Sequence, residues 1–396
     1  MTTPFRVRHV TNPLADRAAA YGDVERAVLN TTANDAARRE IASWPGYAPT
    51  PLLDMQALAA DFGIGQLWLK DEAHRFGLKS FKALGGAYAV LGVLRHVLEH
   101  EHGLTDVSSA DLRAGKYATQ VADITVCCAT DGNHGRSVAW GAQIFGCRCN
   151  IHLHEHVSQG REDAIAAYGA HIIRVPGHYD DSVRAASEDA TREGWHLVSD
   201  TAWIGYEDMA SRVMQGYTSL TAEVLEQLPP EARPTHVFLQ AGVGGLAAAV
   251  AGPMWEAWGD ARPRIIVVEP ESADCVFRSI GAGALTNVPG NLSTFMACLA
   301  AGEMSTAAWT VLKGCADDVL ALEDNAARHA MRVLAATEPP VVAGESGCAG
   351  IAALLTVCQD TKLREALGID ESARVLCINS EGDTDAEAYA ATISDQ

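Results

Sequence analysis

A short turn at residues 131–135 carries three side chains that could do chemistry. Asp131, Asn133 and His134 lie around two glycines, after an apolar run at residues 124–129. A carboxylate, an amide and an imidazole can bind ligands or exchange protons, whereas a strand-to-helix turn needs only the glycines. Asp131 also stands where the cap of a following helix is common, so its sequence position suits both a catalytic group and a helix cap.

Three lysines, Lys70, Lys79 and Lys82, lie close together in the sequence. Lys82 follows Phe81 and opens an apolar segment that predicts a helix over residues 83–94. Burial and the positive end of the helix dipole both favour the neutral amine, so we expect a lowered pKa for Lys82. A neutral amine can form an imine with a carbonyl compound. The alternative is a surface lysine that keeps its charge in water.

A glycine-rich turn at residues 242–246 joins a predicted strand, 236–240, to a predicted helix, 247–258. Its glycines let backbone N–H groups approach a phosphate at the positive end of the helix dipole. No Gly-Lys-Ser/Thr follows, which excludes a P-loop, and the spacing differs from that of a dinucleotide-binding turn. Phosphate binding and a plain strand-to-helix turn are both open on this evidence.

These residues sit in two regions where strands and helices alternate. The first region begins near residue 124 with the strands 124–129 and 149–153, and the second includes the strands 236–240, 264–269 and 374–379. This alternation predicts an α/β fold of two doubly wound domains with largely parallel sheets.

Composition limits the partners. The 396 residues are 48% hydrophobic and 20% charged, as in a soluble globular protein. A net charge of -20 disfavours nucleic acid and anionic membrane surfaces, and we expect neither as a partner. No segment reads as a signal peptide or reaches the ~18 apolar residues of a membrane span. The ten cysteines show no zinc-site spacing, so we expect no metal and a cytoplasmic location.

Five motifs occur in an order that resembles a known enzyme family. They lie at residues 49–52, 70–72, 80–82, 132–135 and 242–246. In this order they resemble the fold-type II pyridoxal-phosphate enzymes, the group of tryptophan synthase β and threonine dehydratase, over about residues 45–385. The resemblance implies a homodimer whose larger, cofactor-binding domain comprises residues 1–89 and 206–396. A smaller αβ domain, residues 90–205, would be inserted into it.

The same resemblance implies roles for individual residues. Lys82 would bind pyridoxal 5′-phosphate covalently, Asn133 would hydrogen-bond its phenolic oxygen, and Ser380 would meet its pyridine nitrogen, with Asn379 as the alternative. The phosphate would be held by Gly242, Val243, Gly244, Gly245 and Leu246. A hydroxyl opposite the pyridine nitrogen leaves the ring unprotonated, which favours elimination over transamination.

Within this group the chain departs from the dehydratases. Threonine and serine dehydratases typically carry serine before Gly-Asn-His-Gly, where this sequence has Asp131. With residues 198–203, 214–217 and 383–385, this aspartate resembles the 2,3-diaminopropionate ammonia-lyases. The resemblance implies elimination from D- and L-2,3-diaminopropionate to pyruvate and two ammonia. The alternatives are a dehydratase or β-eliminase acting on serine, threonine or hydroxyaspartate, and, in another class, a nucleotide-binding or regulatory αβ protein.

Two aspartates are candidates for handling the β-ammonium group of that substrate. Carboxylates match a cationic group better than a serine hydroxyl does, so Asp131 and Asp200 could anchor it. Asp131 could also act as a base on the face of the substrate opposite Lys82. The competing interpretation of Asp200 is a solvated residue after a strand end.

Three other patterns are not assigned to the site. The alternating His152, His154 and His156 are interpreted as structural or solvent-facing residues, not metal ligands. His134 is interpreted as a turn residue and not as a base. Residues 343–347 only weakly resemble the turn that carries the nucleophile of serine hydrolases.

Overall fold

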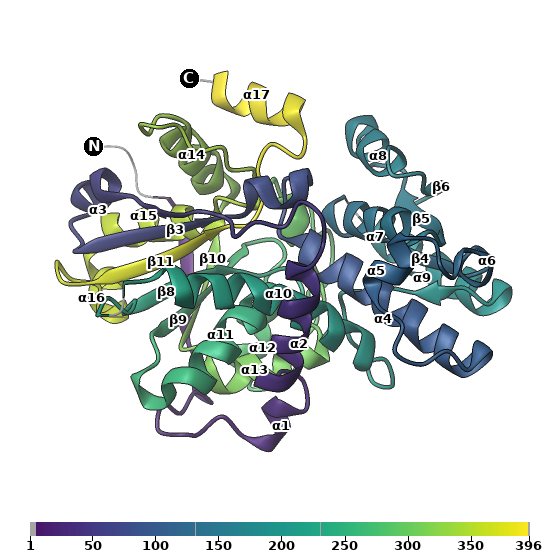
Figure 1. Ribbon diagram of the computed structural model, residues 1–396. Helices are drawn as coiled ribbons and strands as arrows, with labels where there is room; N and C mark the ends of the chain where they lie inside the picture. The colour runs from purple at the N-terminus through teal and green to yellow at the C-terminus, as the bar shows by residue number, and fades with distance from the viewer. Residues whose placement is uncertain (1–4, 131, 230, 395–396) are drawn as a thin grey trace.

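The computed structural model describes residues 5–130, 132–229 and 231–394, and the chain in it forms two β-sheets flanked by helices (Figure 1). The larger sheet has the strand order β1-β10-β9-β8-β11-β3-β2, and the smaller has the order β6-β5-β4-β7. All strand pairs are parallel except the two edge pairs β1–β10 and β2–β3. The predicted α/β fold with largely parallel sheets is confirmed.

The larger sheet is built from both ends of the chain. Its strands are β1 (Val7–Thr11), β2 (Leu52–Asp54), β3 (Gln66–Asp71), β8 (His236–Gln240), β9 (Arg264–Pro270), β10 (Asp318–Leu322) and β11 (Arg374–Asn379). One apolar face packs on α3 (Gln56–Phe62), α14 (Asp324–Ala335), α15 (Ala349–Gln359) and α16 (Thr361–Leu367). The other packs on α10 (Asp208–Gln227), α11 (Gly245–Trp258), α12 (Cys275–Ala282) and α13 (Thr306–Cys315). Four further helices lie outside these layers: α1 (Asp23–Arg26), α2 (Thr31–Ala42), which packs on α10, η2 (Gly259–Ala261) and α17 (Ala386–Ser394).

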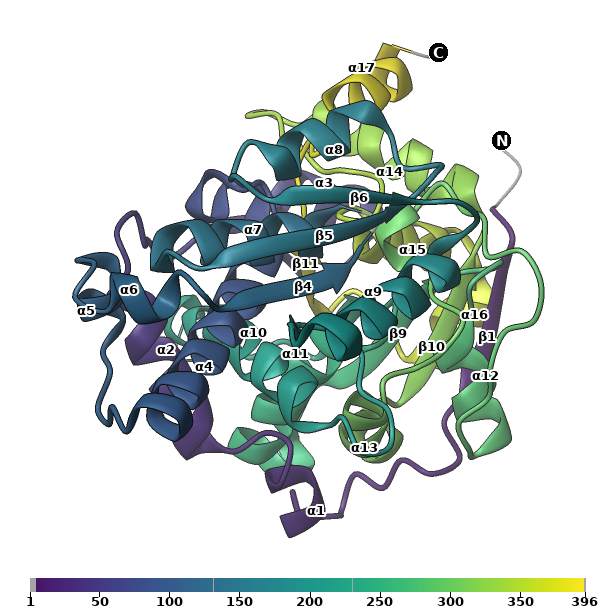
Figure 2. The ribbon, with the colours of Figure 1, turned by 90° about the vertical axis from the view of Figure 1, so that its right-hand side faces the viewer.

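The smaller sheet lies beside the larger one and faces the viewer in Figure 2. Its strands are β4 (Thr125–Ala129), β5 (Arg148–His154), β6 (His171–Val175) and β7 (His196–Leu197). Right-handed crossovers place α7 (Asn133–Phe145) and α8 (Gln159–Ala166) on one face and α9 (Tyr179–Glu193) on the other. The short helices α5 (Ser109–Arg113) and α6 (Ala118–Val121) precede β4.

Helix α4 (Lys82–His102) connects the two sheets and begins at the candidate lysine. Two successive glycines let it pack closely on both sides. A Cβ at Gly85 would lie 2.3 Å from the Tyr217 ring of α10, and a Cβ at Gly86 would lie 1.8 Å from the Ser137 hydroxyl of α7. This close packing fixes the first turn of α4 relative to both sheets. The domain boundary predicted between residues 89 and 90 falls inside this helix, and the domain division stays a prediction.

Most predicted elements occur close to their predicted bounds. The strands at 236–240 and 374–379 coincide with β8 and β11. The helix predicted at 83–94 is longer and extends to His102, where Gly103 in a left-handed conformation ends it. Strand β10 was not predicted, although all five of its residues are buried.

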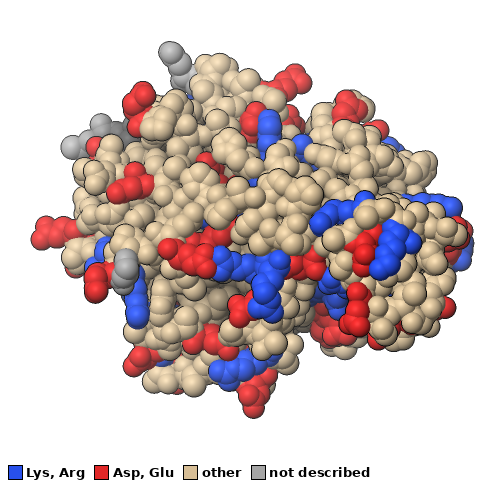
Figure 3. All heavy atoms as spheres, in the orientation of Figure 1, with Lys and Arg blue, Asp and Glu red and all other residues tan. Residues whose placement is uncertain are grey.

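Charged side chains on the surface are mixed in sign. On the face in Figure 3, basic side chains lie among acidic ones, with uncharged surface between the clusters. Among the described residues, none of the helices combines the length and apolar character that a membrane span requires.

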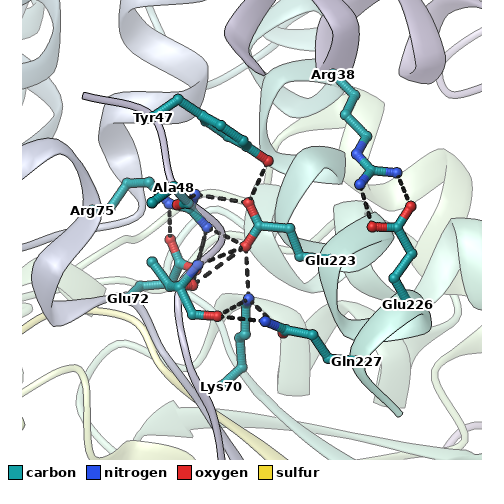
Figure 4. A network of polar contacts seen from close by, with 10 residues as sticks. Arg38, Tyr47, Ala48, Lys70, Glu72, Arg75, Glu223, Glu226 and Gln227 are labelled. Carbon is teal, nitrogen blue, oxygen red and sulfur yellow. Dashed lines mark hydrogen bonds and ion pairs between the residues drawn. The ribbon is translucent and has the colours of Figure 1, made fainter. Parts of the chain in front are cut away.

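A network of four charged residues is buried between α10 and the end of β3 with the segment that follows it (Figure 4). Glu223 of α10 bonds Lys70 Nζ at 2.6 Å and Arg75 Nη2 at 2.7 Å, and Arg75 also bonds Glu72 at 2.7 Å. Two positive and two negative charges compensate one another. Burial alone would raise the pKa of Glu223, but its bonds to Arg75 and Lys70 outweigh burial and lower the pKa to about 2.

We predict that Glu223→Ala destabilises the protein by about 3–5 kcal/mol, because it leaves two buried cations without their carboxylate. Glu226→Ala is the matched control, since Glu226 lies on the same helix and pairs with Arg38 but is 58% exposed. Its loss should change the free energy of unfolding by about 1 kcal/mol or less. Denaturant unfolding measures both, and equal losses would contradict a special role for the buried network.

Candidate active site

A cavity between the two sheets collects the predicted site residues. It lies beyond the carboxyl ends of β4, β7, β8 and β11, where ligands commonly bind in open parallel sheets. The predicted site residues that line it are Lys82, Asn133, Asp200, Gly242, Val243, Gly244, Gly245, Leu246 and Ser380. Asp131 lies outside the described residues, and its role stays a prediction.

Lys82 and Asp200 form a buried ion pair in this cavity. Lys82 Nζ lies 2.5 Å from Asp200 Oδ2, and the two side chains are 17% and 14% exposed. Burial alone would lower the pKa of Lys82, but the Asp200 carboxylate outweighs it and raises the pKa. The expectation of a lowered pKa was therefore wrong for this state, because the sequence did not show that a carboxylate would contact the amine.

The contact with Lys82 also changes the pKa of Asp200. Burial would raise the pKa of Asp200, but the Lys82 ammonium lowers it well below the ordinary range. Asp200 is therefore a largely buried carboxylate paired with Lys82, which excludes the interpretation as a solvated residue after a strand.

The other two lysines have different surroundings. Lys70 is fully buried in the network with Glu223. Lys79 is 40% exposed and pairs with Asp383 Oδ1 at 2.8 Å. Of the three lysines, Lys82 is the one that lines the cavity.

His134 and Tyr217 also line the cavity, although neither was predicted as a site residue. His134 Nε2 donates to the Val198 carbonyl at 2.7 Å, so Nδ1 faces Asp200 Oδ2 at 3.8 Å. Burial lowers the pKa of His134, which favours the neutral ring. The interpretation of His134 as only a turn residue was therefore incomplete. Tyr217 belongs to the segment 214–217 that supported the resemblance, which is the signal that could have identified it.

The glycine-rich turn has the backbone geometry of an anion site. It lies at the N-terminus of α11, and Gly244 has φ +95°, a left-handed conformation. A Cβ at Gly244 would lie 3.0 Å from Ala308 Cβ, and one at Gly242 would lie 3.3 Å from the Cys298 carbonyl. Within the described chain, no acceptor bonds the backbone N–H groups of Gly242, Val243 and Gly244. These groups are free to bind a phosphate.

Ser380 presents its hydroxyl to the cavity. The Gln240 side-chain amide donates to Ser380 Oγ at 2.8 Å, which leaves the hydroxyl proton for another acceptor. Asn379 instead donates to Asp71 Oδ1 at 2.8 Å and the Val342 carbonyl at 2.9 Å. The geometry therefore favours Ser380 over Asn379 as the residue that meets a ligand.

Glu381, which follows Ser380, is a further cavity residue that was not predicted. It is 1% exposed and accepts a hydrogen bond from the Asn133 side-chain amide.

The unassigned patterns have structural partners. His152 is buried and lies 2.8 Å from Asp189. Within the described residues, no group of His, Cys, Asp and Glu could hold a metal ion. The Ser346 hydroxyl accepts the backbone N–H of Cys298 at 3.1 Å.

A family model described as "Pyridoxal-phosphate dependent enzyme" matches residues 43–381. The chain belongs to the pyridoxal-phosphate dependent enzymes. The diaminopropionate ammonia-lyase of Escherichia coli (strain K12) is 40% identical over 351 residues, which cover 87% of each chain. A crystal structure of the holo E. coli diaminopropionate ammonia lyase superposes with a TM-score of 0.89 at 35% identity, over 99% of this chain and 98% of that one.

A second crystal structure, of the E. coli lyase "in complex with aminoacrylate-PLP azomethine reaction intermediate", has a TM-score of 0.88 and 34% identity, again over 99% and 98% of the two chains. Membership of this family makes pyridoxal phosphate the cofactor. The cavity fits it, because it offers a lysine, a phosphate-sized cradle of free N–H groups and a serine with a free proton.

We predict that Gly244→Ala weakens the affinity for pyridoxal phosphate roughly ten-fold or more, because the Cβ strains a left-handed residue and pushes the turn from Ala308. Gly259→Ala is the control at the other end of the same helix, where φ is +54° and nothing lies within 4 Å of the added Cβ. It should cost about 1 kcal/mol of stability or more and leave the affinity unchanged. Equilibrium dialysis measures the affinity, and equal effects of both variants would count against the cradle.

Proposed function

We propose that this protein catalyses the elimination of ammonia from D- and L-2,3-diaminopropionate, which yields pyruvate and two ammonia. The observation that carries the proposal is the buried Asp200 carboxylate, which already binds an alkylammonium group, that of Lys82, at 2.5 Å. The β-nitrogen of diaminopropionate is also an alkylammonium group. Once Lys82 is engaged with the cofactor, the same carboxylate is available to the substrate.

Three residues and the glycine-rich turn would hold the cofactor. Lys82 would carry it covalently, the turn at residues 242–246 would bind its phosphate, Ser380 would donate to its pyridine nitrogen, and Asn133 would donate to its phenolic oxygen. When bound, pyridoxal phosphate acidifies the Cα proton of an amino acid. These roles are supported by the family match and by the common cavity.

Proton transfer at Cα is assigned to two groups. The Lys82 amine would take the proton on its own face of the substrate, and Asp200 is placed to exchange that proton with Lys82. The Nδ1 atom of neutral His134, 3.8 Å from Asp200, lies next in line. Asp131 is proposed, from the sequence, as the base on the opposite face, which would allow both isomers to react.

The leaving group explains why a carboxylate suits this substrate. A β-ammonium group leaves as neutral ammonia when the Cβ–N bond breaks, whereas an unprotonated amine would have to leave as an amide ion. A protein carboxylate beside the β-nitrogen of the substrate favours the ammonium form of that nitrogen, which is the form that can leave. The released enamine takes up water and loses the second ammonia, which gives pyruvate.

Two further properties are proposed. We expect a homodimer from the family resemblance, and a cytoplasmic protein from the cysteine pattern of the sequence. The free state of all ten cysteines, seven of them buried, supports a reducing compartment.

Substrate comparison tests the proposal. We expect kcat/KM for D- and L-2,3-diaminopropionate to exceed that for serine, threonine and hydroxyaspartate by roughly ten-fold or more, because only the first two carry a β-ammonium. Diaminopropionate should also release two ammonia for each pyruvate, measured by coupled lactate and glutamate dehydrogenase assays, whereas serine should release one. A higher kcat/KM for a hydroxy amino acid would identify the protein as a dehydratase instead.

A further inference from the structure

Glu381 is a buried carboxylate in the cavity that the proposed reaction does not use. Its Oε2 atom accepts from the Asn133 amide nitrogen and from the Thr384 hydroxyl at 3.4 Å. Its Oε1 atom accepts the backbone N–H of Ser346 at 3.0 Å. Cys298 Sγ also lies 3.5 Å from Oε2. These four contacts come from separate segments of the chain and hold the Glu381 side chain in one position.

The backbone around Glu381 is also fixed. Residues 380–382 run alongside the segment that leads into Lys82, through the bonds Phe81 N–H to the Ser380 carbonyl at 3.1 Å and Gly382 N–H to the Lys79 carbonyl at 2.9 Å. Ser80 and Glu381 form an antiparallel β-bridge between these two segments. Glu381 therefore connects the segment that precedes Lys82 with Asn133, which lies on α7 beside the smaller sheet.

The contact between Glu381 and Asn133 determines which way the Asn133 amide points. An ionised carboxylate only accepts hydrogen bonds, so the amide must turn its nitrogen, not its oxygen, toward Glu381. The nitrogen carries two hydrogens, and Glu381 uses one. The second hydrogen has only a weak acceptor, Cys298 Sγ at 3.5 Å from the nitrogen, so a stronger acceptor in the cavity can take it.

The cofactor's phenolic oxygen is such an acceptor. A phenolate cannot donate, so it is stabilised by an amide N–H and repelled by an amide oxygen. Without Glu381, the Asn133 amide could rotate and present its oxygen to the cavity.

We propose that Glu381 is a positioning residue, which holds the Asn133 amide with its nitrogen available to the phenolic oxygen of pyridoxal phosphate. The inference rests on the role proposed for Asn133 and is independent of which amino acid the enzyme consumes.

Two neighbouring groups provide the local charge balance. Arg161 pairs with Glu345, the residue before Ser346. Burial raises the pKa of Glu345 to about 7, and the nearby Glu381 adds to that rise while Arg161 opposes it. Glu381 therefore influences the pKa of Glu345 from nearby, whereas the Asn133 amide bonds Glu381 directly.

A double-mutant cycle tests the inference without any substrate. Glu381→Leu removes the acceptor, Asn133→Ala removes the amide, and the readouts are the dissociation constant for pyridoxal phosphate and the absorption maximum of the bound cofactor. Each single variant should weaken cofactor binding by roughly 10-fold to 100-fold and shift the absorption in the same direction, because each removes one hydrogen bond to a charged group. The double variant should be no worse than either single one.

Two further variants separate positioning from charge and from general destabilisation. Glu381→Gln keeps an oxygen that accepts from Asn133, so it should restore both readouts close to those of the unaltered protein. Thr384→Val removes another donor to the same carboxylate and should leave both readouts unchanged. If Glu381→Leu does not fold, Glu381→Asp, whose shorter side chain withdraws the acceptor from Asn133, replaces it in the cycle.

The outcomes are distinct. Additive effects of the two variants, or an effect of Asn133→Ala with a silent Glu381→Leu, would overturn the positioning role alone. A silent Asn133→Ala would overturn the role of Asn133 and the inference with it. Neither result depends on whether diaminopropionate is the substrate, which the substrate comparison decides separately.

Discussion

The ion pair between Lys82 and Asp200 is the interaction on which the site depends. It places two opposite charges in a cavity where both side chains are largely buried, and each charge is stabilised by the other. Lys82 begins the helix that joins the two sheets, whereas Asp200 follows the last strand of the smaller sheet. The pair therefore links the two sheets at the cavity in which we propose that the cofactor binds, and it explains why the pKa of the largely buried Lys82 is raised.

The polar groups around the pair have partners of their own. Lys70 is held in the network with Glu223, and Lys79 pairs with Asp383 at the surface, which leaves Lys82 for the cavity. The free N–H groups of the glycine-rich turn and the free proton of Ser380 mark two more positions at which we propose that the cofactor is held. These positions come from segments far apart in the sequence, and parallel strands bring them to one edge of each sheet.

The sequence predicted the parts of the site that depend on local pattern. Glycine-rich turns after apolar strands predicted residues 242–246 and Asn133, the order of motifs predicted Lys82, and the family resemblance predicted Ser380, all of which line the cavity. The features of the site that the sequence did not predict depend on contacts between residues far apart in the chain. Neither the raised pKa of Lys82 nor the position of His134 beside Asp200 could be read from neighbours in the chain, because Asp200 meets them only in the fold. Glu381 was missed for the same reason, since its partner Asn133 lies 248 residues away.

The central claim is that the Asp200 carboxylate selects a substrate with a β-ammonium group. The most direct measurement is the ratio of kcat/KM for 2,3-diaminopropionate to kcat/KM for serine, in the unaltered enzyme and in Asp200→Asn. The account predicts that both values fall, because Asp200 exchanges a proton with Lys82. The value for diaminopropionate should fall further, by roughly ten-fold or more, because a charge-assisted bond to its ammonium group is lost. An unchanged ratio would contradict the claim and leave Asp200 as a partner of Lys82 only.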